Sequence, residues 1–416
     1  MIKKIVLFLA IVGGIMDGLM AQSSASLSDE VSILKLDQPL VSSSQLGGVT
    51  VDRLGFVYVS NFREAVWQIS PAGEVKLLTD GLYGASGNTI DAKGNLFQAN
   101  FLSHSLVKID RFGAVSTYME KGFNGPVGLV FDQAQNLYVC NFNENNILKI
   151  SPDKQMSVFA SGALFNGPNG ITIDAAGNLY VVNFNSNDVV QIDPSGKATV
   201  FATIAGVDGN AHIVAYNDNF YVTKIKSNRV YQLNKAGQVK LLGGTGQSAI
   251  TEGPALEASF AAPNGIGVDA QTGVLYVNNV KGQWGSRQAS TIEISKIKLL
   301  TLSQLLSHHL DKNEMEAAKK SFQEYRNDPF HAAEDVAAAL VGLGWQYMTR
   351  RNVPASLLLF TLNSETYPDR WQSFFNLGEV YKIIGQAGQA KTFYEKALEK
   401  SPGNKRILER LKQVSK

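Results

Sequence analysis

The chain has 416 residues, of which 44% are hydrophobic and 18% are charged, a composition that is ordinary for a globular protein. Its length allows two or three domains with sizeable cores. The 38 basic and 36 acidic residues give a net charge of +2 and form no long run of one sign, which argues against a nucleic-acid-binding stripe or an acidic tail. Because Cys140 is the only cysteine, no internal disulfide can form, and we interpret it as a small structural residue of a strand.

Residues 1–21 have the pattern of a secretory signal peptide. Lys3 and Lys4 precede an apolar run over residues 5–15, and small residues surround Ala21. This run is too short to span a bilayer comfortably, although a retained anchor helix is the alternative. We therefore predict an exported protein, periplasmic or secreted, that has no membrane association once the signal is removed. Residues 22–30 are interpreted as a linker.

A repeated phrase dominates the next part of the chain. It consists of an apolar strand ending in Asp, a turn, a second strand and a final Asn-Phe, and its clearest copies are VTVDRLGFVYVSNF at 49–62, NTIDAKGNLFQANF at 88–101, LVFDQAQNLYVCNF at 129–142 and ITIDAAGNLYVVNF at 171–184. A worn copy at 211–224 and a sixth copy around Asp269 follow. A period of about 40 residues built from strands and turns is typical of propeller blades. The sequence therefore predicts a six-bladed β-propeller over residues 31–299.

The strand pattern also predicts how the ring closes. After the phrase, most copies continue with a third strand, a tight turn and an outer strand, which gives four strands per blade. The sixth copy has its third strand at 291–297 and no outer strand after it. The segment 32–36 is a spare strand, so we expect the N-terminus to complete the last blade and to remove an exposed sheet edge.

Residues 300–416 change character, because strand alternation stops and apolar residues recur at helical spacing, as in Leu302, Leu306 and Leu310. Two segments align at an offset of 34 residues, which pairs Gly344 with Gly378. This pattern predicts a separate all-α domain over residues 300–416 and resembles tetratricopeptide repeats. The resemblance implies that the helical repeats bind a protein or peptide partner. The alternative is that they only cap the propeller.

The strand region resembles the NHL-repeat propellers and, more loosely, the six-bladed group of gluconolactonase and senescence marker protein. The resemblance is closest in GGTGQSAITEGPALEASFAAPNGIGVD at 243–269, with its spaced glycines and closing Pro-Asn-Gly-Ile. It is specific for architecture and says little about function, because one propeller frame carries many unrelated functions.

Antiparallel pairing places the end of each second strand on one face of the predicted propeller. The repeated asparagines lie there, at Asn61, Asn100, Asn141, Asn183 and Asn279, and four of them are followed directly by Phe. A polar ring with aromatic flanks is a candidate site for a sugar or another small polar ligand. The alternative is turn chemistry, in which each Asn caps its own loop. The worn fifth copy breaks the pattern with His212 and Lys224, which we add to the ligand-face candidates.

A metal site follows from the gluconolactonase resemblance alone. The resemblance implies a divalent metal held at the axis by a Glu, an Asn and an Asp, and it matches Asn169 to the Asn and Asp208 to the Asp. The Glu position holds Gly47-Gly48 instead, which removes the strongest ligand for a hard cation. Calcium is therefore at most weakly held, and we predict no firmly bound cofactor.

No HExxH, GxSxG, Walker loop or paired-Cys motif occurs in the sequence. We therefore predict an exported, non-enzymatic binding or scaffold protein that combines a propeller face with a peptide-binding helical array. The alternative is a divalent-metal-dependent hydrolase or lactonase of the gluconolactonase-like propeller type, with Asn169, Asp208 and His212 at the axis.

Overall fold

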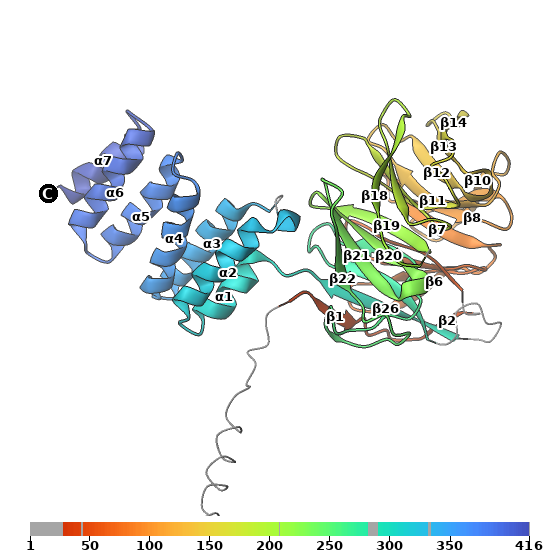
Figure 1. Cartoon of the computed structure of the whole chain (residues 1–416), viewed down its shortest axis with the longest axis horizontal. Helices are drawn as coiled ribbons and strands as arrows, with labels where there is room; N and C mark the ends of the chain where they lie inside the picture. The colour runs from red at the N-terminus through yellow and green to blue at the C-terminus, as the bar shows by residue number, and fades with distance from the viewer. Residues whose placement is uncertain (1–27, 43–44, 208, 282–289, 332–333, 416) are drawn as a thin grey trace, which may run out of the picture.

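The computed structural model describes residues 28–42, 45–207, 209–281, 290–331 and 334–415. Within these ranges the chain forms a six-bladed β-propeller followed by a helical region of seven α-helices (Figure 1). The predicted signal peptide and most of the predicted linker lie outside the described residues. None of the helices in the described ranges combines the length and hydropathy that a membrane-spanning helix needs.

The first five blades are four-stranded antiparallel sheets. Their strands are β3 (Leu46–Val51), β4 (Val57–Asn61), β5 (Val66–Ile69) and β6 (Val75–Thr79); β7 (Ala85–Ile90), β8 (Leu96–Asn100), β9 (Ser105–Ile109) and β10 (Val115–Met119); β11 (Pro126–Phe131), β12 (Leu137–Asn141), β13 (Asn146–Ile150) and β14 (Met156–Ser161); β15 (Pro168–Ile173), β16 (Leu179–Asn183), β17 (Asp188–Ile192) and β18 (Ala198–Thr203); β19 (Asn210–Tyr216), β20 (Asn219–Lys224), β21 (Arg229–Asn234) and β22 (Val239–Gly243). The innermost strands β3, β7, β11, β15 and β19 contact one another in this order.

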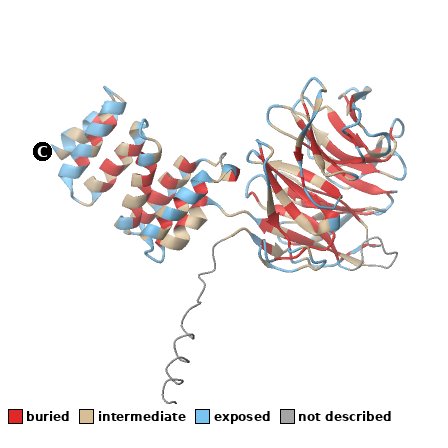
Figure 2. Ribbon diagram, in the orientation of Figure 1, coloured by how far each residue is buried: buried red, intermediate tan, exposed pale blue. Residues whose placement is uncertain are grey.

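The repeated Asp fixes the turn between the first two strands of a blade. In the fourth blade, Oδ1 of Asp174 accepts hydrogen bonds from the backbone N–H groups of Ala176 and Asn178, each at 2.9 Å. The carboxylate of Asp52 binds its own turn in the same way. The turn that the sequence pattern predicted is therefore held by a side chain at its first residue, while the alternate strand residues pack between blades (Figure 2).

The sixth blade combines both ends of the propeller sequence, as predicted. Its strands β24 (Ile266–Val268), β25 (Leu275–Lys281) and β26 (Ser290–Lys298) pair in this order. From the N-terminus, β1 (Glu30–Ile33) pairs with β26 on one side and with the short β23 (Gly253–Pro254) on the other. The closing strand begins at Glu30 rather than at residue 32. A second N-terminal strand that the sequence did not predict, β2 (Leu40–Ser42), pairs with the other half of β26.

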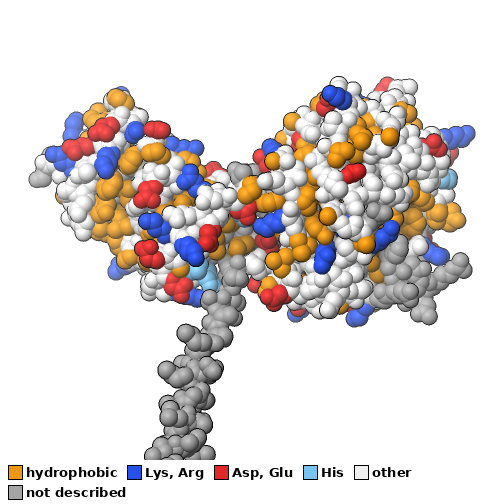
Figure 3. Space-filling view, in the orientation of Figure 1, with side chains coloured by type: hydrophobic (Ala, Val, Ile, Leu, Met, Phe, Trp, Pro, Cys, Tyr) orange, Lys and Arg blue, Asp and Glu red, His pale blue; other side chains and the backbone are white. Residues whose placement is uncertain are grey.

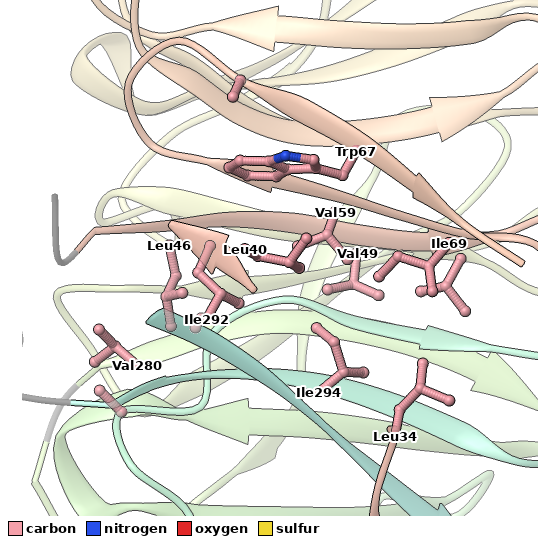
Figure 4. Packing of buried hydrophobic residues seen from close by; sticks show 14 of the residues in the cluster. Leu34, Leu40, Leu46, Val49, Val59, Trp67, Ile69, Val280, Ile292 and Ile294 are labelled. Atoms are coloured by element: carbon pink, nitrogen blue, oxygen red, sulfur yellow. The ribbon is translucent and has the colours of Figure 1, made fainter. Parts of the chain in front are cut away.

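Hydrophobic packing joins the N-terminal segment to the first and last blades. Leu34 and Leu40 lie among Val49 and Trp67 of the first blade and Ile292 of β26 (Figure 4). Leu40 is fully buried, whereas its neighbour Val41 is 56% exposed. The ring is therefore closed by an apolar core as well as by backbone hydrogen bonds.

The fifth blade departs from the repeat where it meets the helical region. Its first turn is a tight one through Asn217 and Asp218, both with positive φ, and it lacks the Asp that caps the other turns. Beside this turn, Nδ2 of Asn219 donates to the carbonyl of Phe330 at 2.8 Å, and Nζ of Lys240 lies 3.2 Å from Oδ2 of Asp328. The altered turn is therefore the propeller surface on which the helical region docks.

The helical region consists of antiparallel pairs. Its helices are α1 (Leu302–Leu310), α2 (Met315–Asn327), α3 (Val336–Thr349), α4 (Val353–Thr366), α5 (Trp371–Ile383), α6 (Ala387–Lys400) and α7 (Lys405–Val414). The sequence offset is reproduced in space, because Gly344 of α3 faces the ring of Phe360 on α4 and Gly378 of α5 faces the ring of Tyr394 on α6. A Cβ at either glycine would lie within 2.8 Å of that ring, so each glycine allows its helix pair to approach closely.

We predict that Leu40 contributes more to stability than any exposed residue of β2. Leu40→Ala deletes a fully buried side chain from the closure core and should lower the free energy of unfolding by about 2 to 5 kcal/mol. Val41→Ala, on the exposed face of the same strand, should change it by less than about 0.5 kcal/mol. Denaturant unfolding of both variants measures the difference, and equal stabilities would contradict closure by this segment.

A second prediction uses two glycines of α3. Gly344→Ala places a methyl group against Phe360 and should cost about 1 to 3 kcal/mol through overpacking. Gly342→Ala, two residues earlier, meets no atom within 4 Å and should stabilise the helix by about 1 kcal/mol. Thermal and denaturant unfolding monitored by circular dichroism compare the two. A Gly344→Ala protein as stable as the parent would refute the close helix contact.

Candidate functional site

One position near the propeller axis is glycine in blades one to four and in blade six, and it is histidine in blade five. The third residue of the innermost-strand segment is glycine at Gly48, Gly87, Gly128, Gly170 and Gly265. A Cβ at these positions would come within 2.3 to 2.9 Å of a backbone atom in the next blade. His212 occupies the equivalent position in β19, and it lines the cavities that lie along the axis.

Two cavities lie along this axis and share His212 in their walls. The cavity on the face where the repeated asparagines end, which we call the mouth, has a volume of about 180 Å³. The lower cavity, of about 210 Å³, is lined by the innermost strands. His212 therefore lies between the mouth and the lower cavity. Burial lowers the pKa of His212 from 6.5 to about 4, so the imidazole is neutral at neutral pH.

Phenylalanine rings form the wall of the mouth. Phe62, Phe101, Phe142 and Phe184 come from four successive blades, and Ile225 continues the series in the fifth. Neighbouring rings lie 5.4, 5.8 and 6.2 Å apart between centroids, with tilted or edge-on geometry. The repeated Asn-Phe thus contributes its aromatic residue, and not its amide, to the mouth.

The floor of the mouth contains two amide side chains that join neighbouring blades. Nδ2 of Asn169 donates to the carbonyl of Ala211 at 2.7 Å, and Nδ2 of Asn264 donates to the carbonyls of Leu46 and Gly47 at 2.8 and 2.9 Å. Both side chains also line the mouth. Nδ2 of Asn264 uses both of its hydrogens in these bonds and Nδ2 of Asn169 uses one, so the amide oxygens are the main atoms left to bind a ligand.

The five asparagines predicted as ligand-face residues lie buried in the turns behind the mouth. Oδ1 of Asn61 accepts from three backbone N–H groups of its own turn, and Oδ1 of Asn141, Asn183 and Asn279 each accepts from the loop that precedes the first strand of its blade. Oδ1 of Asn100 has no such donor within the described ranges. None of the five is among the residues that line the mouth.

Lys224 takes the place of this asparagine in the fifth blade. Its side chain is fully buried, and Nζ donates to the carbonyl of Ile204 at 2.7 Å and to Oδ1 of Asn187. The first of these bonds corresponds to the one that Nδ2 of Asn183 donates to the carbonyl of Leu164. Lys224 therefore replaces a turn contact, whereas His212, predicted together with it, reaches the axis.

A buried polar pair in the second blade was not singled out from the sequence. Asn88 and Gln98 face each other across β7 and β8, where each of the other blades pairs an aliphatic residue with valine. Both amide atoms of Asn88 and Oε1 of Gln98 are buried without a partner in the described part of the chain. The signal was present, since both residues interrupt an apolar pattern that the other copies keep.

The described residues do not fit a calcium site at the axis. The mouth is lined by neutral amides, apolar side chains, one imidazole and the serine Ser86, and no carboxylate is among them. Across the described ranges, no three or more His, Cys, Asp or Glu side chains are grouped to hold a metal ion. Asp208, the acidic residue of the predicted set, lies outside the described residues. Asn169 is at the mouth, but its position alone offers a hard cation one neutral oxygen.

Cys140 lies in β12 and is fully buried. Burial raises the pKa of its thiol, which disfavours the reactive thiolate. This agrees with its interpretation as a small packing residue.

A second candidate site lies in the helical region. A groove of about 420 Å³ runs between α3 and α5 and is lined by Asp335, Ala338, Val341, Asn363, Arg370 and Gln372, among others. Nδ2 of Asn363 donates to Oγ of Ser373 at 3.3 Å, while its Oδ1 is buried and has no donor in the described part of the chain. We call this feature the helix groove.

Comparison with known proteins supports the fold. No protein-family model and no curated sequence matches the chain. Among solved structures, a protein of unknown function from Bacteroides thetaiotaomicron matches 66% of this chain and 76% of its own, with 16% identity and a TM-score of 0.55. An auxiliary nutrient binding protein from Bacteroides ovatus matches over 66% of this chain and 77% of its own length, with 15% identity and a TM-score of 0.54. A gluconolactonase from Xanthomonas campestris matches over 65% of this chain and 95% of its own length, with 13% identity and a TM-score of 0.49.

At such low identity the two Bacteroides similarities show the architecture alone, and none of the three carries an activity over to this chain. The class defined by the fold and the two sites is a six-bladed β-propeller joined to an array of helix pairs.

The half-buried imidazole of His212 predicts a pH-dependent stability. The pKa of His212 is about 4 in the folded chain and 6.5 ordinarily, so its neutral form stabilises the fold fully above pH 6.5 and this contribution falls as the pH drops towards 4. Between pH 6.5 and pH 4 the wild-type free energy of unfolding should fall by on the order of 3 kcal/mol because of His212, and the His212→Gln variant should lack this fall. Denaturant unfolding at several pH values measures it. Thr89→Val alters the same lower cavity without removing a titrating group, and it should keep the wild-type pH profile.

Proposed function

We propose that this protein is an exported binding scaffold. In this proposal the helical region is an array of tetratricopeptide-type repeats that binds an extended peptide in the helix groove, and the propeller mouth holds a small ligand. Export, to the periplasm or outside the cell, rests on the sequence pattern of residues 1–21. The observation that carries the proposal is the unpartnered, buried Oδ1 of Asn363 on the wall of the helix groove.

The repeat geometry supports the tetratricopeptide assignment. The helices α4 (Val353–Thr366) and α6 (Ala387–Lys400) have identical lengths and are displaced by the same 34 residues that relate Gly344 to Gly378. Such arrays commonly use the surface between successive repeats to bind peptides. Asn363 stands where the next repeat has Ala397, so the groove contains a polar atom that the repeat itself does not require.

The chemistry of the helix groove suits a peptide backbone. Oδ1 of Asn363 is buried without a donor, and such an acceptor costs about 1 to 3 kcal/mol. In this proposal the Asn363 side chain rotates towards the groove when a peptide binds, and a peptide N–H group then supplies the donor. Arg370 lines the same groove, with its guanidinium group 4.4 Å from the ring centroid of Tyr367, and it can bind a carbonyl or carboxylate oxygen.

The placement of the helices leaves the groove open. The propeller contacts lie at Asp328 and Phe330, before α3, while α5, α6 and α7 extend away from the propeller (Figure 1). On the visible face of this array, charged residues of both signs are interspersed with hydrophobic side chains (Figure 3). The helical region is therefore attached at one end, which suits the recruitment of a partner better than capping alone.

Metal content distinguishes the scaffold from the hydrolase or lactonase alternative. A metal-dependent hydrolase of this kind needs a bound divalent ion to polarise a carbonyl or activate water. The neutral lining of the mouth leads us to expect no stoichiometric calcium in the purified protein and no change in melting temperature on chelation. Elemental analysis with melting curves tests this, and near-stoichiometric calcium would favour the enzyme.

We predict that filling the helix groove abolishes peptide binding. Peptides selected on the full-length protein from a displayed random library should bind the parent, and Ala338→Arg should weaken them at least about tenfold by occupying the groove. Ala387→Arg changes an equally exposed alanine in the first turn of α6, outside the groove, and should leave affinity unchanged. Failure to select any peptide, or equal affinity for both variants, would contradict the proposed function.

A further inference from the structure

The floor of the propeller mouth is polar, and hydrogen bonds fix the orientation of its two amide groups. The amide groups of Asn169 and Asn264 cannot be reversed without placing oxygen against oxygen, because their nitrogens already donate to backbone carbonyls of the next blade. Their oxygens therefore act as acceptors towards the cavity, and a ligand that binds these oxygens must bring a donor.

The lining of the mouth offers no charge that could compensate a buried ion. No described residue that lines it carries a formal charge at neutral pH. At the rim, Nζ of Lys226 lies 5.3 Å from the ring centroid of Phe184. The positive charge of this ammonium group repels a cationic ligand. The amide oxygens of the floor in turn repel an anion. With no compensating charge in the cavity, transferring any ion into it carries a desolvation cost.

The wall of the mouth favours a flat apolar group. Four phenylalanine rings line the cavity in a tilted or edge-on series, and a further aromatic ring among them gains contacts beyond simple burial. A sugar would leave several hydroxyl groups against this wall without partners. The volume of about 180 Å³ is below the range usual for drug-sized ligands, so it admits one small ring system.

We infer that the mouth binds an uncharged aromatic ring carrying one hydrogen-bond donor, of the phenol or indole class, with the ring between the phenylalanines and the donor on the floor oxygens. This inference rests on the proposed role of the mouth as a small-ligand site. It differs from the sugar-type ligand that the repeated asparagines suggested, because those side chains lie in the turns behind the wall.

Matched probes test the donor without changing the protein. Calorimetric titration of the full-length protein should show saturable binding of phenol and of indole, and fluorobenzene, which lacks a donor at similar size, should bind about fivefold or more weakly than phenol. Benzylammonium and glucose should also bind more weakly than phenol. Equal affinity for phenol and fluorobenzene would overturn the donor requirement, and tighter binding of benzylammonium would overturn the requirement for a neutral ligand.

A variant pair tests the location. Phe142→Leu removes one ring from the wall and should weaken phenol binding several-fold, whereas Phe159→Leu, on the outer strand of the same blade, should not. The asparagines are left unchanged because they join the blades. Binding of glucose alone would overturn the inference and leave a small-ligand role for the mouth standing. Binding of no probe would overturn the inference, and peptide selection on the helix groove would still decide the scaffold function separately.

Discussion

The close approach of the innermost strands at the propeller axis is the constraint on which the rest of the structure depends. Five blades carry a glycine there because a Cβ would meet the backbone of the next blade, at 2.3 Å from the carbonyl oxygen of Asn169 in the case of Gly128. Side chains then join adjacent blades across this contact. Oγ of Ser60 donates to the carbonyl of Ser86, Oγ of Ser86 to that of Pro126, and Asn169 and Asn264 act likewise.

This constraint separates the frame of the molecule from its recognition surfaces. A position occupied by glycine for steric reasons cannot vary freely, and in the fifth blade this position holds His212, which lines both axial cavities. The same blade has an altered turn at its opposite end, where Asn219 contacts the helical region. The fifth copy therefore differs from the others at both ends, with a structural reason at each.

Much of the fold could be predicted from the sequence because it follows from local patterns. Period-two strands, Asp-capped turns and a missing outer strand predicted the blades and their closure, and the 34-residue offset predicted the helix pairs. The candidate site was harder to predict, because it depends on which way side chains point after a bulge. Pairing in the fourth blade shifts between Pro168 and Gly170, which brings Asn169 to the mouth. Asn183, at the end of the next strand, instead turns into its loop.

Long-range contacts account for the remaining differences. The fifth copy looks irregular in sequence, and only the contact between Asn219 and Phe330, 111 residues apart, gives a reason for its turn. Lys224 looked like a functional departure, but its Nζ replaces an asparagine amide at a carbonyl of the preceding loop. Such substitutions preserve a contact while changing the residue, and a single sequence cannot reveal them.

Denaturant unfolding of a Gly128→Ala variant tests the central claim most directly. The added methyl group would meet the backbone between β11 and β15, and we predict a loss of about 3 kcal/mol or more. Gly81→Ala, at an exposed glycine with no atom within 4 Å of its Cβ, should have almost no effect. A Gly128→Ala protein as stable as the Gly81→Ala control would contradict the account, because close packing at the axis would then not determine the frame.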